Sequence, residues 1–180
     1  MEDLTGLKRR VQYYHDILQN TIAYREEWIT HLKGRIIDCL TQMGEESGLD
    51  LEIETKGELQ NLEAIQCSLG QGKSGILQKV SDEFSRPLIK HKGSLIYQQL
   101  FNGKIMVMIT YPYIEGYGEP QPPKTVAIYR PEELKDPFFV RHMEDFIKEV
   151  TKWEDYDDDD SQPINRIGFN VSLPEPEPAE

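Results

Sequence analysis

The sequence LKRRVQYYHDILQNTIAYREEWITHLK, from Leu7 to Lys33, contains neither glycine nor proline. Apolar side chains recur through it and on both sides of it in steps that are almost all three or four residues, which is the spacing of one helix face. They are Leu4, Leu7, Val11, Tyr14, Leu18, Ile22, Trp28 with Ile29, Leu32, Ile36, Cys39 with Leu40, and Met43. The pattern predicts one long amphipathic helix over residues 1–47, about 60 Å long at ~1.5 Å per residue.

A helix of this length is longer than any sheet that the chain could build, because a typical strand spans only ~17–20 Å. The apolar face that extends beyond the sheet needs a partner, which could be another part of the chain, a second copy or a different protein. We therefore expect a homo-oligomer or a heteromeric complex, with Leu18 and Ile22 in the interface.

After Gly44 and Gly48, which suit the end of a helix, the pattern changes to the alternation of strands. An Asn102-Gly103 pair between two strand-like runs predicts a hairpin, because both central turn residues tolerate positive φ. The run from Ile105 to Ile109 is apolar on both faces, so it should be central in its sheet. The predicted strands lie near residues 49–53, 65–69, 95–101, 105–111 and 125–129.

Two more helices are predicted. The spacing of Ile76, Leu77, Val80 and Phe84 fits a short helix that ends at Arg86-Pro87. A longer helix over residues 131–153 should begin at Arg130-Pro131-Glu132-Glu133, since proline suits a first helical turn and acidic side chains favour the positive end of a helix.

The last 27 residues, 154–180, form an acidic, proline-rich tail that includes the runs EDYDDDD and LPEPEPAE. Its composition cannot bury enough apolar surface to offset the entropy of ordering it, so we expect it to be disordered on its own. Within it, residues 164–173 alternate apolar and polar side chains. This segment could add a strand to the edge of a partner's sheet through Ile167, Phe169 and Val171, although a purely solubilising tail is an equal alternative.

Together these patterns predict an α+β fold. One domain over residues 1–153 should contain the long helix (1–47), an antiparallel sheet of about five strands (49–130) and a C-terminal helix (131–153), followed by the tail. The order of long helix, antiparallel strands and helix, with an acidic surface, is similar to the architecture of dimeric secretion chaperones, immunity proteins and phage assembly factors. A shared architecture does not establish a function.

Composition narrows the class of protein. The formal net charge of −12 repels nucleic-acid phosphates and anionic membranes, so neither is an expected partner. The two cysteines, Cys39 and Cys67, lie in apolar segments and do not form a disulfide framework, which favours a reducing compartment. Neither a secretory signal nor a membrane-spanning segment is recognisable, so the sequence indicates a soluble cytoplasmic protein.

Motifs for chemistry are weak. The segment from Gly70 to Ser74 ends like a phosphate-binding loop, but Cys67 stands where the first glycine belongs, and a flexible turn between a strand and a helix is the favoured interpretation. Asp155, Asp157, Asp159 and Ser161 resemble the opening of a calcium loop, but Asp160 and Arg166 occupy the positions that need glycine and glutamate. The four histidines have no metal-ligand spacing. We expect no catalytic residue, cofactor or metal.

The segment from Tyr111 to Pro123 is a long loop rich in tyrosine, glycine and proline. Because tyrosine offers large, rigid contact area, Tyr113 and Tyr117 are candidates for contact with a partner. Equally, Tyr111 and Tyr113 could simply extend the preceding strand and pack at the margin of the sheet.

These observations favour a non-catalytic protein-interaction or assembly subunit, adaptor-like or chaperone-like. One alternative is an acidic inhibitor that mimics DNA, which would need its carboxylates spread over a folded face. The other is an enzyme that binds a nucleotide or phosphate through Gly70–Ser74.

Overall fold

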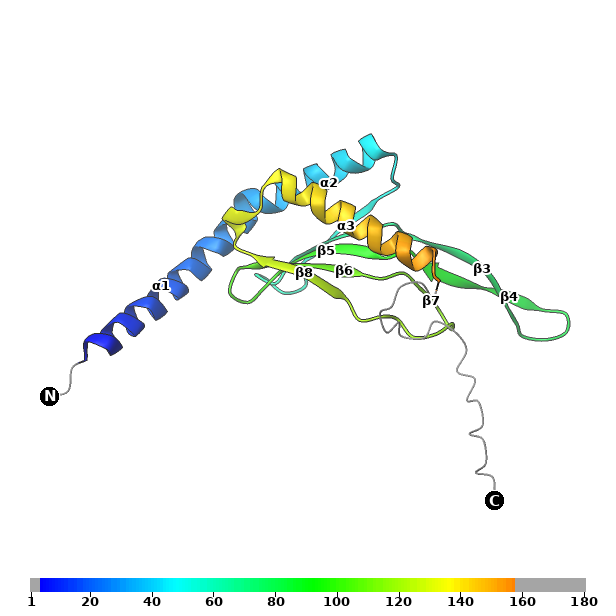
Figure 1. The fold of residues 1–180 in the computed structure, drawn as a ribbon, viewed down its shortest axis with the longest axis horizontal. Coiled ribbons are helices and arrows are strands. Elements are labelled where there is room, and N and C mark those ends of the chain that lie inside the picture. The colour runs from blue at the N-terminus through cyan, green and yellow to red at the C-terminus, as the bar shows by residue number, and fades with distance from the viewer. Residues whose placement is uncertain (1–3, 158–180) are drawn as a thin grey trace, which may run out of the picture.

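The N-terminal helix bears out its predicted length. In the computed structural model, which describes residues 4–157, it comprises α1 (Thr5–Glu27), a π-helical turn η1 (Trp28–Leu32) and α2 (Lys33–Ser47). Gly48 ends α2 in the left-handed conformation, with φ of 72°, and donates its N–H to the Gly44 carbonyl. Figure 1 shows α1 extending away from the sheet as an arm, while α2 lies over the sheet.

The predicted antiparallel sheet is present, and its five strands have the order β1-β2-β5-β6-β8. The expectation of a central strand at Ile105–Ile109 is confirmed, because β6 pairs with β5 on one side and β8 on the other. Strand bounds are β1 (Glu52–Lys56), β2 (Ala64–Ser68), β5 (Ser94–Gln99), β6 (Ile105–Thr110) and β8 (Lys124–Tyr129).

The predicted β5–β6 hairpin is also confirmed, although its turn differs from the expected two-residue type. Gly103 donates its N–H to the Leu100 carbonyl, and the Leu100 N–H donates to the Lys104 carbonyl. Only Gly103 has positive φ, 76°, so Asn102 does not supply a second left-handed residue. These bonds describe a turn followed by a left-handed glycine, the usual geometry of a slightly longer hairpin connection.

The short helix expected at residues 76–84 is wrong. The chain forms a hairpin there instead, with strands β3 (Gln71–Lys79) and β4 (Ser85–His91), and β7 (Tyr113–Ile114) adds a third strand. The pairing shifts between Lys73 and Leu77, where Gly75 has φ of 83°. Such an irregularity disturbs the alternation of side chains, which is why the apolar spacing imitated a helix. Figure 1 shows this hairpin extending from the end of the molecule opposite the arm.

The start of the C-terminal helix also differs from the prediction. Pro131 opens a separate 3-10 turn, η2 (Pro131–Glu133), in which the Arg130 N–H donates to the Glu133 carboxylate at 2.7 Å. The helix α3 (Asp136–Glu154) begins after it, with Pro137 in its first turn. Proline thus occupies the first turn of both elements, and its preference does not distinguish between them.

The core lies between the five-stranded sheet and the two helices α2 and α3, which cover one face of it (Figure 1). Four side chains from the N-terminal helix enter the core: Trp28, Leu32, Ile36 and Leu40. From α3 come Phe139, Met143, Phe146 and Val150, and from the sheet Ile65, Cys67, Leu95, Tyr97, Ile105, Val107 and Ile109. Alternate residues of β6 are buried in this core, as expected for a strand with one face under the helices.

Candidate functional site

The arm presents a continuous apolar face to solvent. In the described helix α1, none of the residues Thr5–Glu27 is buried. Five of the exposed apolar side chains recur in alternating steps of three and four residues, which is the heptad spacing that brings two helices together, while Tyr13 and Ile17 are exposed outside this set. We call this set the arm stripe, and it comprises Leu4, Leu7, Val11, Tyr14 and Leu18. Ile22, the second residue expected in an interface, is 59% exposed and lies beside the stripe.

The arm stripe ends at its C-terminal side where α1 contacts the β5–β6 turn. The next two positions of the same heptad are Thr21 and Arg25, and both meet this turn. A Cβ built on Gly103 would lie 2.7 Å from the Tyr24 Cβ and 3.0 Å from the Thr21 carbonyl oxygen. The Arg25 Nη2 donates to the Phe101 carbonyl oxygen at 2.7 Å. The Phe101 side chain beside this junction remains 76% exposed.

A polar cluster fixes the base of the arm to the body. The Trp28 indole Nε1 donates to a carboxylate oxygen of Glu63 at 2.9 Å, and the Lys33 Nζ donates to the same oxygen at 2.8 Å. The hydrogen bonds from Lys33 and then from Trp28 hold the pKa of Glu63 below its usual value. Gln99 contributes its side-chain oxygen as acceptor for the Glu63 N–H. The arm is therefore anchored where it leaves the sheet.

The tyrosine-rich loop lies away from the arm, at the other end of the sheet (Figure 1). Tyr113 belongs to β7, and its ring stacks on His91 with centroids 4.5 Å apart and planes 7° apart. Tyr117 is half-buried and forms a bridge to Ile114. Tyr113 thus packs at the margin of the three-stranded sheet, in a separate strand and not in an extension of β6, which ends at Thr110. Neither tyrosine shares a surface with Leu18 or Ile22.

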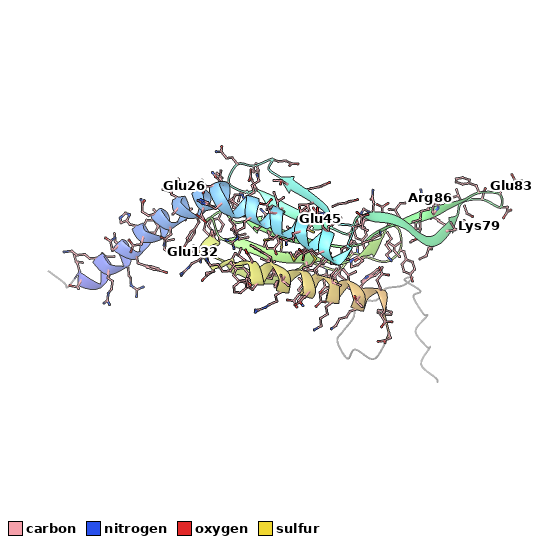
Figure 2. All side chains as sticks on the ribbon, turned by 90° about the horizontal axis from the view of Figure 1, so that it is seen from above. Glu26, Glu45, Lys79, Glu83, Arg86 and Glu132 are labelled. Carbon is pink, nitrogen blue, oxygen red and sulfur yellow. The ribbon has the colours of Figure 1, made fainter. Side chains whose placement is uncertain are left out.

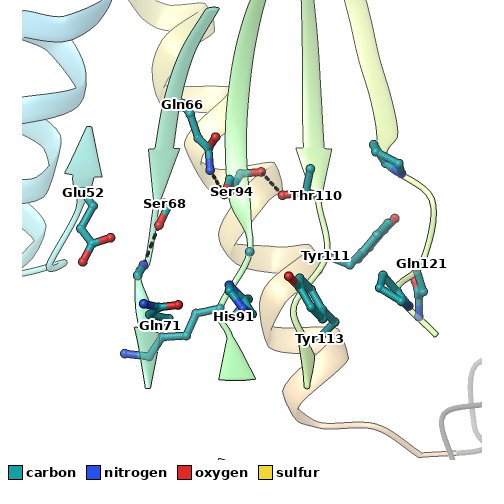
Figure 3. Close-up of a pocket in the computed structure, with 15 residues that line it drawn as sticks. Glu52, Gln66, Ser68, Gln71, His91, Ser94, Thr110, Tyr111, Tyr113 and Gln121 are labelled. Carbon is teal, nitrogen blue, oxygen red and sulfur yellow. Dashed lines mark hydrogen bonds between the residues drawn. The ribbon is translucent and has the colours of Figure 1, made fainter. Parts of the chain in front are cut away.

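A polar pocket of about 420 Å³ adjoins Tyr113, between the two sheets (Figure 3). Among its lining side chains are Glu52, Gln66, Gln71, Lys92 and Tyr111. Much of the lining is engaged internally: the Gln66 Nε2 donates to the Ser94 hydroxyl at 3.0 Å, and the Tyr111 hydroxyl donates to Glu149 at 3.4 Å. These groups can hydrogen-bond a small polar molecule. Sequence reasoning missed the pocket because its residues come from separate strands and loops with no local pattern.

An apolar groove of about 880 Å³ lies between α2 and α3 on the outer side of the helices. Its apolar lining consists of Met43, Leu49, Val140, Met143 and Ile147. The charged side chains beside them have both signs, Glu46 and Glu144 against Lys148 and Lys152. The groove is therefore a second apolar surface, with no single sign of charge to select an occupant.

The glycine motif does not adopt the geometry of a phosphate-binding loop. Gln71, Gly72 and Lys73 pair with β4 in an extended strand, and no helix follows them in this part of the described chain. The Ser74 hydroxyl donates to the Leu88 carbonyl at 2.8 Å and accepts from the Ile76 N–H at 3.1 Å. The expected turn between a strand and a helix is therefore also wrong, because a second strand replaces the helix.

The histidines lie in separate places. His142 is fully buried between two tyrosines, with its Nδ1 and Nε2 each 3.1 Å from a hydroxyl, those of Tyr97 and Tyr129 respectively. Burial lowers the pKa of His142 to about 4, so the ring is neutral near pH 7. Within residues 4–157, no group of His, Cys, Asp and Glu side chains is arranged to hold a metal ion.

The predicted docking residues Ile167, Phe169 and Val171, and Asp159 to Arg166 of the calcium-like motif, lie outside the described residues. None of the helices that the structure describes has an apolar stretch long enough to cross a bilayer. Comparisons of the chain with protein-family models, with curated proteins and with solved structures gave no match.

Proposed function

We propose that this chain is a non-catalytic protein-interaction subunit of an assembly and that the arm stripe is its docking surface. The observation that carries the proposal is a helix of 23 residues, α1, without a buried residue along its described length. Helices in proteins draw most of their stability from packing an amphipathic face. The arm has such a face, and its own body covers none of it. A partner supplies the missing contacts.

Two further features support this proposal. Ser74 is engaged within an extended strand, so the nucleotide-binding alternative lacks the loop that it would need. Cys39 and Cys67 are free thiols, which is in keeping with a protein that works in the cytoplasm. The polar pocket beside Tyr113 provides hydrogen bonds but does not by itself define a reaction.

The test compares the wild-type chain with the double variant Leu18→Asp/Ile22→Asp. Two charges on the apolar face should remove arm-dependent association, whether the partner is a second copy in sedimentation or a different protein captured from native lysate. The matched control is Tyr13→Asp/Gln19→Asp, which adds the same charge to the arm away from the stripe. Circular dichroism checks that the arm remains helical.

We expect the control to associate like the wild type and the stripe variant not to associate. If neither self-association nor any captured protein differs between the stripe variant and the wild type, the arm is not a docking surface and the proposed function fails.

A further inference from the structure

We infer that the occupant of the arm stripe is the arm of a second copy of this chain, packed antiparallel, so that each arm ends at the β5–β6 turn of the other copy. The inference rests on the proposed function and adds the identity and orientation of the partner.

The antiparallel orientation of the two arms follows from the place where the body of the chain covers the end of the stripe. At Thr21 and Arg25 the stripe meets the β5–β6 turn, and at Trp28 the same face packs into the chain's own core. A helix lying along the stripe must therefore end near Thr21. A second copy running parallel would continue there into its own body, in the space that the first body occupies. An antiparallel copy presents its free N-terminal end at that point instead.

The length of the arm matches this arrangement. If Leu4 of one copy lies opposite Thr21 of the second copy, the heptad places Leu7 opposite Leu18 and Val11 opposite Tyr14. All five stripe residues are then covered in both copies, and no part of the stripe is left over. Phe101 of each copy lies beside the other copy's Leu4, which gives this exposed ring a contact.

The covered surface is sufficient for a specific pair. The half-exposed stripe side chains of both arms, with Phe101 at each end, remove on the order of 1,000 Å² from water. This is near the ~1,000 Å² that a specific interface should reach. The affinity of the dimer should therefore be moderate, so that the fraction of paired chains depends on protein concentration.

Charge also favours the antiparallel orientation. The arm carries Lys8, Arg9 and Arg10 near its N-terminal end, whereas Glu26 and Glu132 lie at its base (Figure 2). Antiparallel pairing brings the positive N-terminal end of one helix to within about 8 Å, along the axis, of Glu26 of the second copy. A parallel pair would instead bring together Lys8 and Arg10 of both arms, which flank the stripe.

The test measures distances between spin labels in the full-length chain, with Cys39 replaced by serine and the fully buried Cys67 left in place. One variant carries the label at Asp16→Cys and the other at Ala23→Cys, both on the face of the arm away from the stripe. In the antiparallel pair the two labelled positions are offset along the axis by about 10 Å for residue 16 and about 32 Å for residue 23. A parallel pair has no offset at either position.

Because the two labels of a pair are also separated sideways by roughly 25 Å across the two helices, we expect the residue 23 distance to exceed the residue 16 distance by about 13 Å. We also expect Leu18→Asp to abolish both dipolar signals. Equal distances at the two sites would show a parallel pair and overturn the inference. A labelled chain that sediments as a monomer at micromolar concentration, while arm-dependent capture of another protein persists, would overturn this inference and leave the proposed function standing.

Discussion

Truncating Leu7 and Leu18 to alanine, singly and together, tests the antiparallel pair through its energetics. The two residues are eleven positions apart, about 16 Å along one helix, so they cannot touch within a single arm. Substitutions this far apart normally have additive effects. Across the antiparallel pair, however, Leu7 of one copy packs against Leu18 of the other. A coupling between them can therefore arise only in the assembly.

The expected magnitude follows from their exposure. Full burial of a leucine side chain contributes about 1.5–3 kcal/mol. Leu7 is 56% exposed and Leu18 is 44% exposed, so covering what remains contributes roughly 1 kcal/mol for each side chain. Each contact occurs twice in a two-fold pair, so either single substitution should weaken dimerisation by about 2 kcal/mol, or roughly 30-fold in Kd.

The double variant should lose less than the sum of the two single losses. Once Leu18 is truncated, Leu7 of the second copy has less apolar surface to pack against, and we expect about 3 kcal/mol rather than ~4. Sedimentation equilibrium over a range of concentrations gives each Kd. Thermal unfolding of the dissociated chains should be nearly unchanged, because neither side chain is buried in one copy.

The control pair is Leu4→Ala with Tyr14→Ala, ten positions apart on the same stripe but not opposite one another in the antiparallel pair. Their losses should add to within about 0.5 kcal/mol. Additive losses for Leu7 and Leu18 as well would mean that these residues do not face each other, and the reasoning from the closed stripe would be refuted.

Two further predictions concern the body. Gly103→Ala adds a Cβ at a position with positive φ, where it would meet the backbone of α1, so urea unfolding should show a free energy of unfolding lower by about 3 kcal/mol. The control Gly75→Ala should lower it by only about 1 kcal/mol, because φ is also positive there but nothing lies within 4 Å of the added Cβ. Equal losses would contradict the contact at the base of the arm. Because burial lowers the pKa of His142 to about 4 while the unfolded ring titrates near its usual value, only the unfolded state gains a proton as the pH falls from about 6.5 to 4. The free energy of unfolding, measured by urea unfolding at each pH, should therefore fall by roughly 3 kcal/mol over that range. In His142→Gln the fall should be smaller in the upper part of this pH range. If the variant showed the same dependence of unfolding free energy on pH as the wild type, His142 would not titrate as a buried neutral ring.

The elements that local pattern determines could be predicted from the sequence. The alternation through Ile65 and Cys67 indicated β2, because that strand buries one face. The steps of three and four residues indicated a helix over 1–47, and the described helical residues are 5–47. The β3–β4 hairpin was mistaken for a helix because the irregular pairing at Gly75 hid the period of two.

The candidate site was only half visible in the sequence. Leu18 and Ile22 could be identified as unpartnered, because they lie on an apolar face beyond the reach of the sheet. The end of the stripe could not be identified from the sequence, since it depends on the contact between Arg25 and Phe101, which lie 76 positions apart in the chain. The polar pocket was hidden for the same reason, because Glu52 and Lys92, 40 positions apart in the chain, line the same pocket only in the folded structure.

The π turn η1 explains how one helix serves two surfaces. The buried residues Trp28, Leu32, Ile36 and Leu40 are spaced by four, whereas the arm stripe alternates threes and fours. At 3.6 residues per turn, each step of four rotates a side chain about 40° past the previous one. A regular helix would soon turn this row away from the sheet.

In η1 the Lys33 N–H donates to the Trp28 carbonyl five residues earlier. This turn is wider than an α-helical turn, so it offsets the extra rotation between the first two of the four buried residues, Trp28 and Leu32. Trp28 is also the residue that Glu63 holds in place. The change from the spacing of the arm to the spacing of the core therefore occurs where the helix is anchored. Upstream of that point, the rotation of the arm stripe about the helix axis is fixed relative to the sheet. A partner helix consequently meets a surface of defined direction, and the β5–β6 turn gives that surface a defined end.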